Sequence, residues 1–200
     1  MQDGLQSYSE LLKESYAVIK AEDPSAVVHT GGLSQELPKC LRRLYDQGAG
    51  RFFDVLNIHP FINPLMPDAA GGLRFFYERV RRTLEAYGDA SKPIWFSCIG
   101  CPGMKDPAAA RPWGLGKNPS ELVQAEWVRT VYGVISQGWP GVEKIFWGTF
   151  RDTDGHFKTG LDYAGLLRND FSRKPAYEVY RRMASSAAAL TLPSGRTNRS

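Results

Sequence analysis

Two cysteines close a short apolar segment near the middle of the chain. The segment IWFSCI, residues 94–99, contains Cys98 and is followed by Gly100 and Cys101, so the cysteines form a C-x-x-C pair. Such a pair is used in redox couples and as two ligands of a zinc ion. His59, which ends an earlier apolar segment, could supply a third ligand. A redox couple, a zinc site and simple packing all stay open as roles for these cysteines. Packing is favoured because no second C-x-x-C pair accompanies the first.

The segment that carries Cys98 has the pattern of a strand buried on both faces. Lys92-Pro93 begins it, and proline suits the first residue of a strand, where no ladder donor is lost. The apolar run then stops at Gly100, and a loop rich in glycine and proline follows. Because α/β proteins place their chemistry where parallel strands end, Cys98 lies at a candidate site.

The remaining segments alternate between the two hydrophobic periods. Apolar residues at helical spacing predict helices, and short apolar runs predict strands. The alternation implies a parallel sheet with right-handed crossovers. At 200 residues the chain is shorter than the roughly 250 of a closed eight-stranded barrel, which leaves a small open sheet or half of a barrel. The predicted helices are 8–22, 35–47, 71–87, 120–137 and 174–189, and the predicted strands are 26–30, 52–59, 93–99 and 142–150.

Composition narrows the classes of function. The net charge of +4 is mild, Lys and Arg are scattered among acidic residues, and no nucleic-acid-binding motif accompanies them. No apolar run approaches the roughly 20 residues of a membrane span, so no membrane partner is expected. No basic segment followed by an apolar one opens the sequence, so no signal peptide is visible and the compartment stays unknown. Three cysteines do not make a disulfide framework.

Four segments together resemble the C-terminal half of a clan A glycoside hydrolase, the (β/α)8-barrel class that includes β-xylosidases and cellulase-like enzymes. Residues 8–24 are similar to the helix after the fourth barrel strand. The sixth strand of the family usually ends His-Pro-Tyr, and here the sequence is His59-Pro60-Phe61. The seventh usually ends Thr-Glu-apolar-Gly, and here it is Ser97-Cys98-Ile99-Gly100. Residues 144–177 resemble the eighth strand and its helix.

The resemblance implies a fold and a substrate class. The expected fold is α/β, a partial (half) TIM barrel of four β/α units with parallel strands. It forms a single domain over residues 1–190, with a flexible tail at 191–200. The expected substrate is a β-linked glycan, no cofactor is expected, and the expected partner is a second copy or a separate N-terminal half barrel.

The same resemblance places the catalytic residues, and three of them differ. Cys98 occupies the position of the nucleophilic Glu, Phe61 that of the Tyr beside it, and residues 1–7 lack the Asn-Glu pair that carries the general acid/base. Retaining hydrolysis needs two carboxyl groups about 5–5.5 Å apart. The chain is therefore expected to be a glycosidase-like domain that binds or acts on glycans, with its status as an enzyme uncertain. A non-catalytic carbohydrate-binding or scaffold protein, a pseudoenzyme, is the alternative.

Five further residues are expected to contact the sugar. Aromatic faces bind the apolar C–H face of a pyranose, which suits Trp147 at the end of the last strand and Trp113 in the long loop. The strand-terminal histidines His59 and His29, and Asp152 after the last strand, could bind hydroxyl groups. Packing roles or a loop salt bridge are the alternatives for each.

Overall fold

The computed structural model describes residues 2–34 and 37–191, which form two compact units. Unit 1 comprises Met1–Cys101 and Val134–Thr149, and unit 2 comprises Pro102–Gly133 and Phe150–Ser200. Thr191 is the only residue of the predicted flexible tail that lies within the described part. No helix in that part is both long and apolar enough to cross a bilayer.

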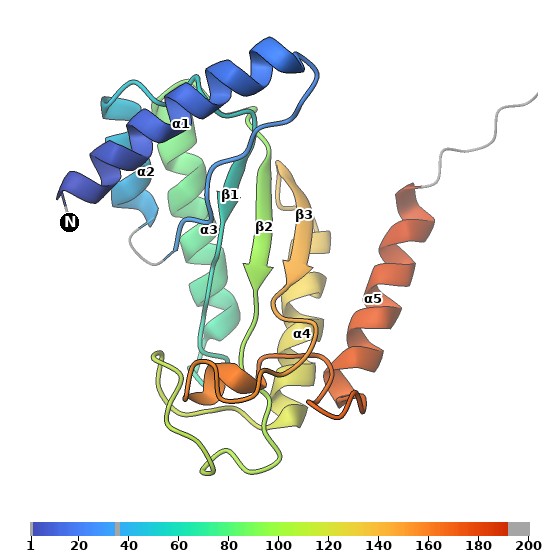
Figure 1. Cartoon of the computed structure of the whole chain (residues 1–200). Helices are drawn as coiled ribbons and strands as arrows, with labels where there is room; N and C mark the ends of the chain where they lie inside the picture. The colour runs from blue at the N-terminus through green and yellow to red at the C-terminus, as the bar shows by residue number, and fades with distance from the viewer. Residues whose placement is uncertain (1, 35–36, 192–200) are drawn as a thin grey trace, which may run out of the picture. The chain divides into compact units, whose positions relative to one another are not determined.

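Unit 1 contains a parallel sheet of three strands in the order β1-β2-β3 (Figure 1). Leu56 of β1 is paired with Ile94 of β2, and Phe96 of β2 with Ile145 of β3. The sheet is open and does not close into a barrel. The predicted α/β class, a partial TIM barrel with parallel strands, is confirmed. The strand bounds are Leu56–Ile58 for β1, Ile94–Ile99 for β2 and Val142–Trp147 for β3.

The segment predicted as the first strand, 26–30, joins the sheet through single bridges. His29 bridges Val55 and Leu33 bridges Ile58, both in parallel. The Leu33 amide donates to the Asn57 carbonyl at 3.3 Å, and the His59 amide to the Leu33 carbonyl at 2.7 Å. The fourth strand position is therefore occupied, but its backbone ladder is interrupted at Gly31-Gly32.

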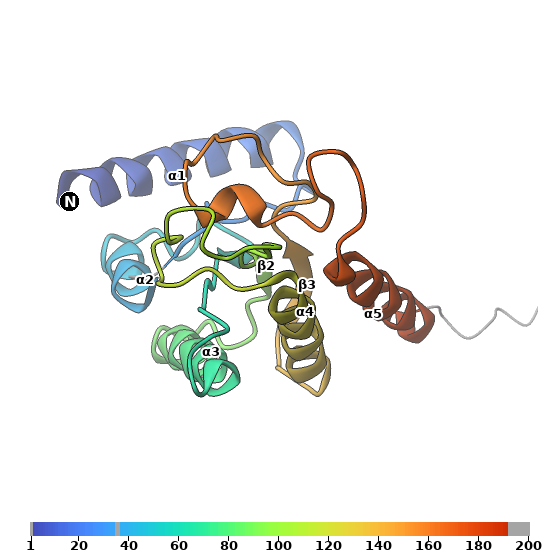
Figure 2. The ribbon, with the colours of Figure 1, turned by 90° about the horizontal axis from the view of Figure 1, so that it is seen from below.

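Three helices belong to unit 1: α1 (Gln2–Glu22), α2 (Leu37–Asp46) and α3 (Ala69–Ala86). The Asp68 side chain caps α3 by accepting a hydrogen bond from the Gly71 amide at 2.9 Å. Leu73, Val80 and Leu84 are fully buried and lie on one face of α3, as the helical spacing predicts. Seen from below, α1 and α3 lie on opposite sides of the sheet (Figure 2).

The start of β1 is fixed to α1 by an acidic residue. Asp54 accepts a hydrogen bond from the Tyr16 hydroxyl at 3.1 Å and pairs with Lys20 at 2.9 Å. The Asp54 carboxylate also accepts a hydrogen bond from the Val28 amide at 2.8 Å. Asp54 therefore joins α1 to the end of the sheet where the strands begin.

Unit 2 contains most of α4 (Glu121–Ser136), whose last residues from Val134 belong to unit 1, together with η1 (Gly160–Tyr163) and α5 (Pro175–Thr191). Two loops, 102–118 and 150–174, make up much of the rest. Asn118 gathers the first loop, because its side-chain amide donates to the carbonyls of Pro107, Ala110 and Arg111 at 3.0–3.2 Å.

A buried lysine joins both loops of unit 2. Lys174 is 1% exposed and its ammonium lies 2.7 Å from a carboxylate oxygen of Asp152, which is 4% exposed. The same ammonium donates to the carbonyls of Gly103 and Tyr163 at 2.8 Å each. All three donor hydrogens of Lys174 are thus used within unit 2.

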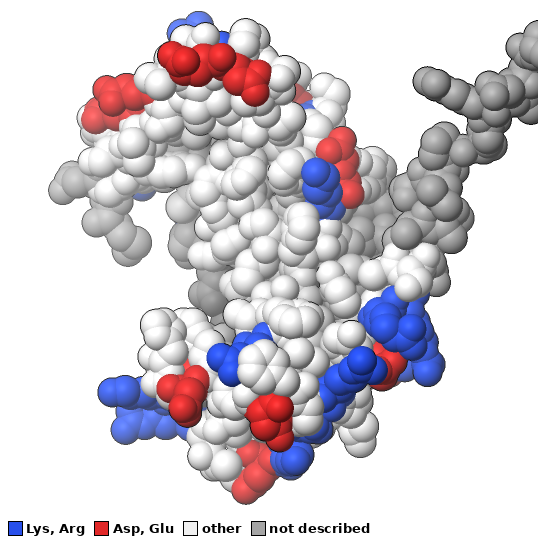
Figure 3. Space-filling view, turned by 45° about the vertical axis from the view of Figure 1, so that its right-hand side comes forward, with Lys and Arg blue, Asp and Glu red and all other residues white. Residues whose placement is uncertain are grey.

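Charged side chains on the surface are mixed in sign. Blue and red groups both occur among the described side chains of the face that Figure 3 shows. This agrees with the scattered Lys and Arg of the sequence and its mild net charge.

Replacing Lys174 with methionine is expected to destabilise the protein by about 3–5 kcal/mol, because it leaves the Asp152 carboxylate buried without its partner. Urea denaturation followed by circular dichroism measures this. Lys117→Met, at an exposed lysine in the same unit, is the control and should change stability by less than about 0.5 kcal/mol. Equal effects for the two variants would show that the buried pair is not a stabilising cross-link.

Candidate functional site

The ends of β1 and β2 bring a histidine and a serine together. Ile58 is paired with Phe96, so the next residues, His59 and Ser97, are neighbours across the two strands. The His59 Nε2 atom lies 2.9 Å from the Ser97 hydroxyl. Both side chains are partly buried, which leaves part of each ring or hydroxyl open to a ligand.

Two buried polar residues hold this pair in place from below. The Asn57 side-chain oxygen accepts a hydrogen bond from the Ser97 amide at 3.2 Å. The Thr30 hydroxyl accepts from the Asn57 amide at 2.9 Å and lies 3.2 Å from the Asn57 carbonyl, to which it donates. Thr30 and Asn57 are almost wholly buried. The network therefore ties the segment 29–33, β1 and β2 together at the level of the site.

A glycine lets the His59 ring lie where it does. A Cβ atom on Gly32 would be 2.0 Å from His59 Cε1, so only glycine allows this approach. Phe61 contacts the ring edge-on, with centroids 6.3 Å apart. Burial lowers the pKa of His59 below its ordinary value, so the imidazole is neutral at pH 7. A neutral imidazole both donates and accepts a hydrogen bond.

Cys98 is next to this pair and is half-buried. A Cβ atom on Gly148 would lie 2.3 Å from its sulfur, so the thiol rests directly on the backbone that follows β3. Burial raises the pKa of the Cys98 thiol, which is therefore protonated at neutral pH. Neither Cys98 nor Cys101 forms a disulfide within the described part of the chain, and Cys101 is completely buried. Among the described residues no group of three or more His, Cys, Asp and Glu is placed to hold a metal ion.

Trp147 lies at the same end of the sheet as His59 and Ser97, whereas His29 lies nearer the other end. Trp147 ends β3, is paired with Ile99 and is 8% exposed, so it presents only a small part of its ring. His29 is level with Val55, four residues before His59, which is about 13 Å at about 3.3 Å per residue. Its ring instead contacts Trp95, with centroids 5.7 Å apart.

The other two predicted contacts belong to unit 2. Trp113 is buried in the long loop. Asp152 is buried against Lys174 and also accepts a hydrogen bond from the Gly165 amide at 2.9 Å. Within its own unit Asp152 therefore serves as a structural anchor.

Solved glycoside hydrolases share this fold, although no family model and no curated protein matches the sequence. A family 39 glycoside hydrolase from the gut symbiont Bacteroides cellulosilyticus WH2 is 24% identical with a TM-score of 0.66, over 89% of this chain and 37% of its own. A GH2 β-galacturonidase from Eisenbergiella tayi is 17% identical with a TM-score of 0.65, over 96% and 32%.

A third neighbour is an α-L-arabinofuranosidase from Thermotoga maritima, 13% identical with a TM-score of 0.62, over 88% of this chain and 35% of that enzyme. The chain thus spans about a third of the length of these three proteins. At these identities the likeness is one of fold. The chain has a glycoside-hydrolase fold in partial form.

Sequence patterns indicated His59 and Cys98 but missed the residues that support them. The strand pattern could have indicated Ser97, because it lies on the same face of the strand as Trp95 and level with His59 in a parallel pairing. Gly32 follows the predicted strand 26–30 and Gly148 lies within the predicted strand 142–150, and neither pattern indicates their close contacts with a ring and a sulfur, which come from tertiary packing.

Gly32→Ala is expected to displace the His59 imidazole into solvent, because the new methyl group overlaps the ring. The His59 pKa should then rise toward its ordinary value of about 6.5, since burial is what lowers it. Histidine NMR signals followed from pH 4 to 8 measure the shift. Gly4→Ala, where a Cβ atom would meet nothing, is the control, and an unchanged His59 titration in Gly32→Ala would contradict the packing described.

Proposed function

We propose that this chain is a domain of glycoside-hydrolase descent that binds β-linked glycans where the strands of unit 1 end. The observation that carries the proposal is the His59–Ser97 pair, fixed at the carboxyl ends of parallel strands. Sites of barrel proteins lie at these strand ends. The shared fold of glycoside hydrolases supports a glycan as the ligand.

The chemistry of the pair suits sugar hydroxyl groups. The neutral His59 ring and the Ser97 hydroxyl each donate and accept hydrogen bonds, as sugar hydroxyls do. Ser97 is fixed through its amide by Asn57, so it needs little ordering when a ligand binds. Trp147 on the neighbouring strand end would contribute its small exposed part. We assign the sugar contacts to these three residues.

Binding without hydrolysis is the activity we infer for the chain by itself. Retaining hydrolysis needs a nucleophilic carboxylate and a second carboxyl group as acid/base. Cys98 stands at the nucleophile position of the resemblance, and its raised pKa keeps the sulfur as a thiol, which is a poor nucleophile. The same protonation, and the complete burial of Cys101, weigh against the alternative of a thiol redox centre.

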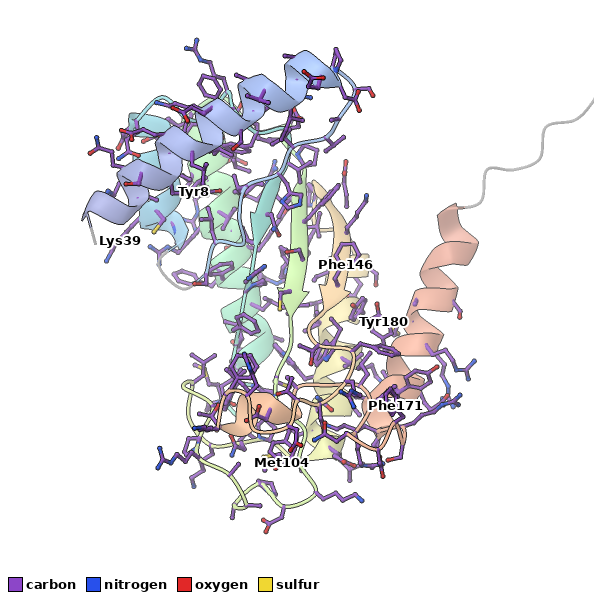
Figure 4. The ribbon with its side chains drawn as sticks, viewed as in Figure 1. Tyr8, Lys39, Met104, Phe146, Phe171 and Tyr180 are labelled. Carbon is purple, nitrogen blue, oxygen red and sulfur yellow. The ribbon has the colours of Figure 1, made fainter. Side chains whose placement is uncertain are left out.

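The chain is also proposed to be the C-terminal half of a barrel that pairs with an N-terminal half or with a second copy. Strand β3 is an edge of the sheet, and its residue Phe146 is 46% exposed (Figure 4). Val27, in the segment at the opposite edge, is 58% exposed. Edge strands with exposed apolar side chains tend to pair with further strands.

Isothermal titration with neutral β-linked xylo- and gluco-oligosaccharides is expected to show binding that His59→Ala weakens about tenfold, as for the loss of roughly one strong polar contact. His156→Ala, at an exposed histidine of unit 2, is the matched control and should bind like the unmodified chain. Binding that is absent, or equally affected by both variants, would refute the proposed site.

Light scattering is expected to give a mass above the 22.3 kDa of one chain, because the sheet edges pair between copies when no separate half is present. Phe146→Asp adds a charge to one edge and should shift the population toward the monomer. Leu122→Asp, which changes an equally apolar but helical and exposed residue, should leave the mass unchanged. A monodisperse monomer of the unmodified chain would rule out pairing between copies.

A further inference from the structure

Unit 2 contains a cavity of about 460 Å³ that lies wholly within that unit. This is within the range of about 300–1,000 Å³ that small-molecule sites occupy. Its walls come from the start of the long loop, the first turn of α4 and the segment after η1. Met104, labelled in Figure 4, supplies part of the apolar wall together with Ala109.

Several charged groups of the wall are already satisfied by one another. The Arg168 guanidinium binds both oxygens of Glu121, at 2.8 and 2.7 Å. Its remaining nitrogen donates to the Ser172 hydroxyl and the Arg173 carbonyl. Asp152 is paired with Lys174. These groups therefore hold one another in place as a fixed wall.

Three charged side chains of the wall can still form hydrogen bonds with a ligand. Asp106 uses one oxygen to accept from the Ala108 amide at 3.0 Å, and Asp170 uses one to accept from the Ser172 amide at 2.9 Å. The second oxygen of each has no partner among the described residues. Lys105 forms no ion pair within that same part of the chain. The cavity therefore offers one ammonium and two carboxylate oxygens.

We propose that this cavity is a second carbohydrate site, separate from the strand ends of unit 1, which binds a neutral sugar unit and discriminates against uronic acids. A hydroxyl group donates to a carboxylate and accepts from an ammonium, so a neutral sugar satisfies both signs at once. A carboxylated sugar would face Asp106 and Asp170 with only Lys105 to offset them. A cationic ligand would face Lys105. The apolar wall suits the C–H face of the sugar.

This inference rests on the proposed function for its choice of ligand, but it makes a separate prediction. Ala109 lines the cavity and is exposed, so Ala109→Trp fills it without removing a polar contact. Ala108 is the exposed neighbour outside the lining, and Ala108→Trp is the matched control. Titration calorimetry with a neutral gluco-oligosaccharide then counts the sites in the unmodified chain, in both variants and in His59→Ala.

Two sites in the unmodified chain and one in Ala109→Trp, with Ala108→Trp unchanged, are the expected result. One site that is lost in His59→Ala and intact in Ala109→Trp would overturn the cavity proposal and leave the strand-end site standing. One site that is lost in Ala109→Trp and intact in His59→Ala would support the cavity and refute the strand-end site. No binding at all would overturn both.

The discrimination by charge is tested with the same chain. Galacturonate should bind the cavity at least tenfold more weakly than neutral galactose, measured in His59→Ala, in which the strand-end site is expected to bind about tenfold more weakly and so contributes less to the signal. Asp106→Asn removes one charge and keeps the oxygen that accepts from Ala108. It should narrow the difference severalfold, and equal binding of the two sugars by the unmodified cavity would contradict the assigned selectivity.

Discussion

The parallel register between β1 and β2 is the constraint on which the site of unit 1 depends. Ile58 opposite Phe96 makes His59 and Ser97 neighbours, and the Asn57 side chain binds the Ser97 amide in that register only. A slip by one residue would turn the polar side chains to the other face of the sheet. The Thr30–Asn57 hydrogen bonds add a third segment to the same arrangement. Buried polar residues thus fix the register here, in addition to the apolar residues that fill the core.

Much of the fold followed from periodicity, because the pattern of burial on helices and parallel strands is a local property. All five predicted helices appear, four of them shifted by one or two residues at their ends and the first beginning six residues earlier, at Gln2. Three predicted strands also appear, but 52–59 is reduced to Leu56–Ile58 and 142–150 ends at Trp147. The segment 26–30 was predicted as a strand but joins the sheet only through single bridges. Two consecutive glycines weaken the backbone ladder, and the apolar residues alone do not reveal this. The short helix η1 was not predicted. Its capping depends on Asp162 and Thr159, polar residues in a loop without an apolar period.

The site was only partly predictable, and the reason differs between residues. His59 and Cys98 end apolar strands, so their position follows from topology. His29 also ends an apolar segment, but the bridge to Val55 sets it about 13 Å from His59 along the sheet, at about 3.3 Å per residue. Register between separate strands cannot be obtained from either strand alone. Lys174 had no signal, because lysine is almost never fully buried unless paired, and its partners are distant in sequence.

The long loops of unit 2 are held in place by a buried ion pair and its hydrogen bonds, because the sheet belongs to unit 1. The Lys174 ammonium binds Gly103, Asp152 and Tyr163, and all three residues line the cavity. One buried cation therefore holds three separate parts of the wall at fixed positions. It also neutralises Asp152, so the charge that a ligand meets comes from Lys105, Asp106 and Asp170 alone. The selectivity we infer for neutral sugars thus depends on a residue that no ligand touches, because an unpaired Asp152 would add a third negative charge to the wall.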